Sequence, residues 1–201
     1  MQFPPGARQS AVHFAWADAA VLHREWRNTA CFDRRSMLFC CDERTNMMMY
    51  TDMLTNDYTD AAFQTAFKTY FAEISLKINN WDGLFQEMEE SGENFTYVRK
   101  DEKGDVTGFI QFTTMDMTSW FFTAKCGFIR EFWVREDLRG HGHGSQLLAL
   151  AEEWMQAQGC ACALLTTDTA PGFYEKHGYG KEVGIQARNK DDVYLKPLRP
   201  L

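Results

Sequence analysis

The sequence predicts an α/β fold in which helices pack on a mixed sheet, and three observations carry this prediction. Two stretches between residues 57 and 91 space their apolar residues three and four apart, which is typical of amphipathic helices. Two pairs of strand-like segments flank short polar turns, as in antiparallel hairpins. Between these hairpins come a strand, a glycine-rich loop, a helix and a second strand, which predicts a right-handed crossover with parallel strands.

The chain has 201 residues, 45% of them hydrophobic, which is enough for one well-packed core and short for two. We therefore expect one main domain over residues 47–201. Residues 1–46 differ from the rest, with a Pro-Pro-Gly opening, one short helix and a polar stretch, and are treated as an N-terminal extension. The methionines Met47 to Met49 begin an expected first strand to Leu54 and also offer an alternative start of translation.

Two helices are expected before the central strands. The first follows Asp57, and the second begins after Asn80, which can cap it, and stops at Ser91-Gly92. Their apolar stripes consist of Phe63, Ala66, Phe67, Tyr70, Phe71 and Ile74 in the first helix, and of Trp81, Leu84, Phe85 and Met88 in the second. We expect both stripes to be buried, the first of them against the sheet.

The remaining strands are expected at residues 95–100, 106–113, 127–134, 160–166, 183–188 and 193–198. The segment from Met115 to Lys125 is expected to be a loop between two of them. A long helix that buries Leu147, Leu148 and Trp154 ends at Gly159, and a short helix follows the strand that comes after it. The last two strands are expected to form a hairpin.

The formal charge of −7 argues against a nucleic-acid partner, because no basic cluster longer than Arg34-Arg35 interrupts the acidic background. No apolar run reaches membrane-spanning length and no signal-peptide pattern opens the chain, so we expect a cytoplasmic protein with no membrane partner. The six cysteines include no C-x-x-C pair, which favours reduced thiols. An acidic protein would attract a cationic small molecule, although such charge often serves solubility alone.

A glycine-rich loop opens the long helix and reads Arg139-Gly140-His141-Gly142-His143-Gly144-Ser145. Unpaired backbone N–H groups at a helix N-terminus attract an anion, and glycines let phosphates approach closely. The segment lacks the spacing of the Rossmann fingerprint and the lysine of the P-loop. A bare strand-to-helix turn is the structural alternative. Two histidines are too few ligands for a metal, so we expect no metal site.

The loop matches R-x-x-G-x-G, with the strand residues Ile129–Val134 before it and Gly172–Tyr179 about thirty residues on. In this order and spacing, the chain resembles the GNAT acyltransferase superfamily from Met47 to Leu198. The resemblance implies a GNAT fold, with a mixed, mostly antiparallel sheet of six to seven strands and helices on both faces. It also implies acetyl-CoA as co-substrate. The implied coenzyme-binding residues are Trp133, Val134, Arg139, Gly140, His141, Gly142, His143, Gly144 and Ser145, largely through backbone N–H groups.

Within this resemblance, Glu131 is the candidate general base that takes the proton of the amine, directly or through water. A strand carboxylate paired with Arg130 or Lys125 is the alternative reading. Tyr174 matches the tyrosine that protonates the departing thiolate. A backbone N–H near Trp133 or Val134, where strands of the family bulge and splay, is expected to polarise the carbonyl. The asparagine that often precedes the tyrosine motif is absent, which leaves that coenzyme contact in doubt.

The implied function is N-acetylation of a primary amine on a small molecule, by direct attack in a ternary complex. Protein lysine or N-terminal acetylation and a non-catalytic acyl-CoA sensor are the alternatives. Specificity is expected to come from the two early helices, the Met115–Lys125 loop and the final hairpin. The aromatic trio Trp120 to Phe122 fits a cleft lining, core packing or a homodimer contact equally well.

Overall fold

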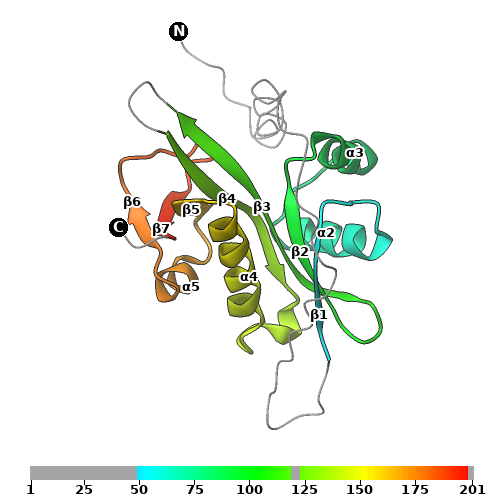
Figure 1. Ribbon diagram of the computed structural model, residues 1–201. Coiled ribbons are helices and arrows are strands. Elements are labelled where there is room, and N and C mark those ends of the chain that lie inside the picture. The colour runs from blue at the N-terminus through cyan, green and yellow to red at the C-terminus, as the bar shows by residue number, and fades with distance from the viewer. Residues whose placement is uncertain (1–48, 119–122, 199–201) are drawn as a thin grey trace.

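The computed structural model describes residues 49–118 and 123–198. Over these residues the sheet has seven strands in the order β1-β2-β3-β4-β5-β7-β6 (Figure 1). The strands are β1 (Thr51–Thr55), β2 (Phe95–Lys100), β3 (Val106–Thr118), β4 (Thr123–Val134), β5 (Cys162–Thr167), β6 (Gly180–Glu182) and β7 (Asp192–Pro197). All neighbouring strands are antiparallel except β4 and β5, which run parallel. The predicted mixed, mostly antiparallel sheet and the central crossover are therefore confirmed.

Helices cover both faces of the sheet, as predicted. They are α2 (Ala61–Glu73), α3 (Trp81–Ser91), α4 (His143–Ala157) and α5 (Pro171–Lys176), with a short 3-10 helix η1 (Glu136–Leu138) before α4. In Figure 1, α4 crosses one face of the sheet, and α2 and α3 lie toward the β1 edge. The expected N-terminal extension, the residues Met47 and Met48, and the trio Trp120–Phe122 lie outside the described residues.

The two faces hold separate cores. The core on the α2 and α3 side is rich in aromatic rings and consists of Tyr58, Phe63, Ala66, Phe67, Phe71, Leu84, Phe85, Met88, Val98, Val106, Phe109 and Trp133. The core on the α4 and α5 side includes Ile110, Phe112, Ile129, Leu147, Leu148, Ala151, Trp154, Met155, Leu165, Tyr174 and Tyr179. Adjacent residues such as Phe109 and Ile110 point into opposite cores, because side chains alternate along a strand.

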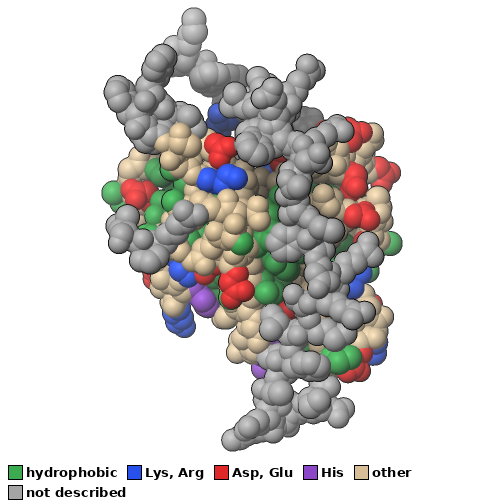
Figure 2. Space-filling model, viewed as in Figure 1, with side chains coloured by type: hydrophobic (Ala, Val, Ile, Leu, Met, Phe, Trp, Pro, Cys, Tyr) green, Lys and Arg blue, Asp and Glu red, His purple; other side chains and the backbone are tan. Residues whose placement is uncertain are grey.

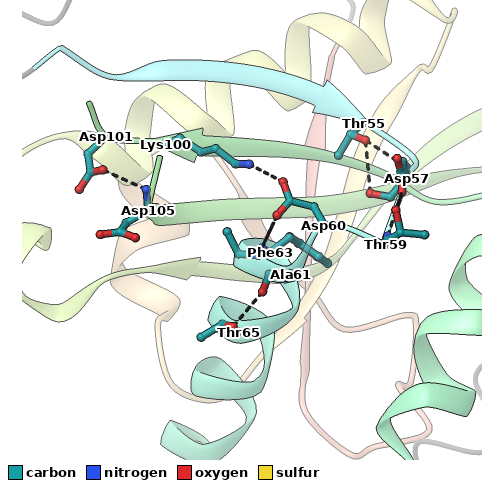
Figure 3. A network of polar contacts seen from close by, with 11 residues as sticks. Thr55, Asp57, Thr59, Asp60, Ala61, Phe63, Thr65, Lys100, Asp101 and Asp105 are labelled. Atoms are coloured by element: carbon teal, nitrogen blue, oxygen red, sulfur yellow. Dashed lines mark hydrogen bonds and ion pairs between the residues drawn. The ribbon is translucent and has the colours of Figure 1, made fainter. Parts of the chain in front are cut away.

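The start of α2 is fixed by its capping residue. The Asp60 carboxylate accepts hydrogen bonds from the backbone N–H groups of Ala62 and Phe63, and its other oxygen pairs with Lys100 of β2 (Figure 3). This cap satisfies two of the donors that a helix N-terminus leaves unpaired. The predicted stripe is buried except at Tyr70, which is partly exposed, and at its end, because the helix stops at Glu73 and leaves Ile74 41% exposed.

Two predicted connections are wrong. The expected loop from Met115 to Lys125 is mostly strand, since β3 and β4 stay paired as far as Thr118 and Thr123. This pairing extends beyond the core, so no alternation of buried residues signals it in the sequence. The final hairpin also differs, because β7 pairs with β6 rather than with residues 183–188. Val183 is 90% exposed and contributes nothing to a core.

The described part of the chain contains no helix that is long and apolar enough to cross a membrane. Within the same part, Cys126, Cys160 and Cys162 are free cysteines.

Candidate functional site

The central strands β4 and β5 form a V-shaped opening. They pair only where Cys126–Phe128 lies beside Cys162–Leu164. Beyond this contact the strands diverge, and the remainder of β4 has no β5 partner, as the resemblance implies. Gln111 of β3 pairs with Glu131 while the next residue, Phe112, pairs with Ile129, so Arg130 is the extra residue of a β-bulge.

This bulge lies at Arg130 and not near Trp133 or Val134, where it was expected. Its position changes the face to which the catalytic candidate points. Ile129 belongs to the core on the α4 side, and in a regular strand Glu131 would point to that side as well. Because of the extra residue, the Glu131 side chain instead meets Tyr70 of α2, on the opposite face.

Glu131 accepts a hydrogen bond of 2.7 Å from the Tyr70 hydroxyl to its Oε2. Burial raises the pKa of this carboxyl to about 7, against the lowering effects of the Tyr70 hydrogen bond and of the nearby Arg130 charge. Arg130 itself donates to Asn94 Oδ1, so the closest partner of the carboxylate is a phenol and not a cation. A carboxyl group with a pKa near neutrality suits a general base.

Tyr174 lies on α5, 8% exposed, and shares the surroundings of Glu131. Burial raises the pKa of Tyr174, and the Glu131 charge raises it further, so the phenol keeps its proton. Burial and the same carboxylate raise the pKa of Tyr70 as well. The structure thus brings together one carboxylate that titrates near pH 7 and two protonated phenols.

The glycine-rich loop leads into the N-terminus of α4, and its backbone is not covered by side chains of its own. Gly140 and Gly142 have φ angles of 80° and 88°, in the left-handed region that favours glycine, and nothing lies within 4 Å of a side chain built at either position. Gly142 caps the helix without a side-chain hydrogen bond. Among residues 49–118 and 123–198, no side chain accepts from the N–H groups of the first turn, which begins at His143, and these groups fit a phosphate anion.

Arg139 and Val134 anchor this loop. The Arg139 Nε donates to the Val134 carbonyl at 2.8 Å, and its Nη2 lies 2.5 Å from Glu73 Oε2 at the end of α2. The expected phosphate donor is therefore held on two sides by protein acceptors. His141 is exposed, and no group of three or more metal-ligating side chains occurs among the described residues.

The ring of His143 is directed into the protein. Its Nδ1 lies 2.9 Å from Arg99 Nη1, and Arg99 makes a two-pronged ion pair with Asp52, each contact 2.7 Å long. Gln146 of α4 accepts a further hydrogen bond from Arg99 at 2.7 Å. Burial, and next the Arg99 charge, lower the pKa of His143, which stays neutral. This cluster ties β1 and β2 to the first turn of α4.

Ser145 is linked to His177 at the end of α5. The His177 Nδ1 lies 2.8 Å from the Phe173 carbonyl, which can only accept, so Nδ1 carries the ring proton in the neutral form. Nε2 is then the acceptor for the Ser145 hydroxyl at 2.9 Å. This contact, which the sequence did not reveal, joins the two helices beside the opening between β4 and β5.

Tyr70 and Gln111 are the other site residues that sequence reasoning missed. Tyr70 was predicted only as part of an apolar stripe, although a buried tyrosine needs a polar partner and could have been singled out for that reason. Gln111 is fully buried directly across from Glu131. Its amide lowers the pKa of Tyr58, yet neither amide atom makes a hydrogen bond of ordinary geometry among the described residues.

Comparison with known proteins agrees with this geometry. The family model described as "Acetyltransferase (GNAT) family" matches residues 52–179. No curated protein matches the chain significantly.

Solved structures with a similar fold include a protein from Clostridium acetobutylicum described as a "predicted acetyltransferase with acetyl-CoA". Its TM-score is 0.58, and the two chains are 13% identical over 69% of this chain and 95% of that one. The protein YhbS from Escherichia coli, in complex with CoA, has a TM-score of 0.55 and a sequence identity of 16%, over 76% of this chain and 82% of that one. A chain of the NatC complex bound to Gag peptide and CoA has a TM-score of 0.52 and a sequence identity of 19%, over 76% of this chain and 99% of that one. At these identities the likeness is one of fold.

Proposed function

The chain belongs to the acetyltransferase (GNAT) family, and on this premise we propose that it moves the acetyl group of acetyl-CoA to a primary amine of a small molecule. The observation that supports the proposal is the Glu131 carboxyl, which has a pKa of about 7 and accepts a hydrogen bond from Tyr70. Amines are protonated near neutral pH, so acyl transfer to them requires such a base.

Each residue of the site has one role in this reaction. Glu131 accepts the proton of the substrate ammonium, which frees the nitrogen lone pair to attack the thioester carbonyl. As the nitrogen–carbon bond forms and the carbon–sulfur bond breaks, Tyr174 donates its proton to the leaving thiolate. The products are an amide, a thiol and one proton. Backbone N–H groups of β4 near Trp133 and Val134 are proposed to stabilise the carbonyl oxygen.

The coenzyme is proposed to bind with its pyrophosphate on the first turn of α4. The left-handed Gly140 and Gly142 and the uncapped N-terminus of the helix fit this group. Three proteins of similar fold are described with acetyl-CoA or CoA, which supports the same ligand here. The hydrogen bond from Ser145 to His177 would hold α4 and α5 at a fixed separation around the pantetheine arm.

A peptide amine is the second candidate acceptor. It is favoured by the similarity of fold to a chain of the NatC complex, which is described with a Gag peptide. A non-catalytic sensor is disfavoured, because a buried carboxylate with a raised pKa beside a protonated phenol would have no use in it.

The proposal is tested by thiol release from acetyl-CoA with a panel of small primary amines and a matched panel of peptides. Binding of CoA is first established by a thermal shift, since a ligand that binds the folded state raises the melting temperature. We expect release with at least one small amine and none without acceptor. Release with peptides alone would move the assignment to a protein acetyltransferase, and coenzyme binding without any release would leave the sensor.

A further inference from the structure

The β-bulge in β4 brings two charged side chains of consecutive residues to one face of the sheet. In a regular strand, consecutive side chains point to opposite faces. Here the Glu131 carboxylate meets Tyr70 of α2. The Arg130 guanidinium meets Asn94, which lies between the end of α3 and the start of β2. Both side chains therefore lie on the side that α2 and α3 cover, with an arginine beside the proposed base.

The charge of Arg130 acts on this base. Burial raises the pKa of Glu131, while the Tyr70 hydrogen bond and then the positive charge of Arg130 lower it. Burial also lowers the pKa of Arg130, but a guanidinium keeps its proton throughout the range in which a carboxyl titrates. The other titratable groups that act on this pair, within the described part of the chain, are Tyr70 of α2, Tyr174 of α5, Tyr58 before α2 and Glu93 after α3.

Asn94 fixes the position of the guanidinium. This residue is 1% exposed, and its Oδ1 accepts a hydrogen bond of 3.1 Å from Arg130 Nη1. Its Nδ2 donates to Ser91 Oγ at 3.2 Å, and the Ser91 hydroxyl donates in turn to the Met88 carbonyl at 3.1 Å. Because that hydroxyl spends its only proton on a carbonyl, it must accept from Asn94. The amide is therefore oriented with its oxygen toward Arg130.

A neutral amide can hold a cation in place without cancelling its charge. Arg99 is bound by the carboxylate of Asp52, whereas the Asn94 side chain that accepts from Arg130 carries no charge. Figure 2 shows acidic side chains gathered over α3, and Glu87 of that helix is exposed, so water and salt screen its charge. The positive charge of Arg130 thus remains available to the neighbouring carboxylate.

We propose that Asn94 is a positioning residue for the reaction, which holds the guanidinium of Arg130 beside Glu131 and so favours the ionised form of the base. Asn94 acts through Arg130 and not by contact with a substrate. The inference rests on the proposed function, because it takes Glu131 as the group that accepts the proton of the amine. Its effect is to extend the activity of the enzyme to lower pH, where a more strongly raised carboxyl would be protonated.

The titration of Glu131 is measured by NMR of the side-chain carboxyl carbon in protein labelled with ¹³C-glutamate, and Glu131→Gln identifies its signal. The wild-type midpoint is expected near pH 7. Arg130→Met should raise the midpoint by about half a pH unit or more, because a nearby positive charge is lost. Arg130→Lys keeps the charge and should raise it less. An unchanged midpoint in Arg130→Met would overturn the proposal.

The role of Asn94 is tested by a double-variant cycle. Asn94→Leu has a similar volume but no acceptor, so it should raise the midpoint, and it should add little to the rise in Arg130→Met. Fully additive rises would show that Asn94 acts independently of Arg130 and would contradict a positioning role. Asn94→Asp keeps the shape of the side chain and pairs the guanidinium with a carboxylate, so the midpoint should rise here too.

Two control variants separate this role from packing and from net charge. Thr96 is fully buried nearby, and its hydroxyl contacts the Tyr58 hydroxyl at 3.2 Å, so Thr96→Val removes a buried polar group of the same region. Glu87→Lys changes the charge on the surface of α3. Both should leave the Glu131 midpoint unchanged, and circular dichroism verifies that each variant is folded. A rise in Thr96→Val or Glu87→Lys as large as that in Asn94→Leu would refute the positioning role.

The NMR titrations need neither acetyl-CoA nor an acceptor, so they separate the two proposals. If both hold, the rising limb of the pH–rate profile should move with the NMR midpoint in each variant, while the rate at high pH changes little. Midpoints that respond as expected in a protein without acetyl transfer would refute the proposed function alone. Acetyl transfer by a protein whose Glu131 midpoint ignores Asn94→Leu and Arg130→Met would refute this inference alone.

Discussion

Two carboxylates, the buried Asp52 and the partly buried Glu131, lie on opposite sides of the sheet in very different surroundings. Asp52 is 8% exposed and receives two hydrogen bonds from the guanidinium of Arg99, which also contacts His143 and Gln146. Glu131 receives one hydrogen bond, from the neutral phenol of Tyr70. The first carboxylate belongs to a cluster in which charge and hydrogen bonds are matched, whereas the second carries a charge that its partner does not neutralise.

The difference in their partners suggests that Asp52 stabilises the fold, whereas Glu131 suits a role in the reaction. A buried ion pair with matched hydrogen bonds resists any change in protonation, and removing one partner leaves an uncompensated charge. A buried carboxylate that lacks a paired cation instead gains a raised pKa, so it exchanges protons near neutral pH. We therefore expect substitutions at Asp52 and Arg99 to act on stability and substitutions around Glu131 to act on rate.

Glu131→Gln should have the largest effect on rate. The amide keeps the shape of the side chain and an acceptor for Tyr70 but cannot take a proton, so turnover should fall by about 10²- to 10⁴-fold. In steady-state assays the wild-type rate should rise with pH through about 7, and this limb should vanish in the variant. A variant that retains wild-type turnover would show that another group is the base.

The same variant should be more stable than the wild type at alkaline pH. The folded state raises the pKa of Glu131 from 4.5 to about 7, so ionisation costs folding free energy that accumulates as the pH rises from 4.5 to 7. The gain in the free energy of unfolding at pH 8 should be about 1–3 kcal/mol and should disappear at pH 4. Urea unfolding at both pH values measures it, with Glu87→Gln as control.

Arg99→Met should give the largest loss of stability. It leaves the Asp52 carboxylate buried without its cation, which should lower the free energy of unfolding by about 3–5 kcal/mol in urea unfolding. Affinity for CoA should weaken too, because His143 loses its contact at the first turn of α4. Adding Asp52→Leu should recover much of the stability. A loss below about 1 kcal/mol would contradict the scaffold role.

Tyr174→Phe tests whether Tyr174 is the general acid that protonates the leaving thiolate. Removing the phenolic proton should lower turnover by about 10- to 100-fold and leave the affinity for CoA, measured by calorimetry, unchanged. Tyr179→Phe is the matched control, since that tyrosine is also buried in the α4-side core. An unaltered rate in the Tyr174 variant would end its assignment as the acid.

Tyr70→Phe should have the smallest effect, and that effect should depend on pH. The Tyr70 hydrogen bond lowers the pKa of Glu131, so its loss should move the rising limb of the pH–rate profile to higher pH. At pH 7 the rate should drop by about two- to fivefold, and the difference should shrink at pH 9. An equal drop at every pH would indicate a structural role for the hydroxyl.

The sequence was sufficient for features that depend on neighbouring residues. The caps Asn80 and Gly92, the stripe of α2 and the loop from Arg139 to Ser145 were all readable, because caps, periodicity and glycine conformations are set within a few residues. The wrong connections lie where no core contact exists. Val183, for example, is 90% exposed, although the pattern of residues 183–188 predicts a strand.

The sequence by itself thus determined most of the helices and strands, the glycine-rich loop and two catalytic candidates. Only the tertiary structure decided which partners those candidates have. Tyr70 and Glu131 are 61 positions apart and meet because the bulge at Arg130 turns the carboxylate toward α2. Such contacts depend on strand register and helix packing, which couple residues distant along the chain and leave no local pattern.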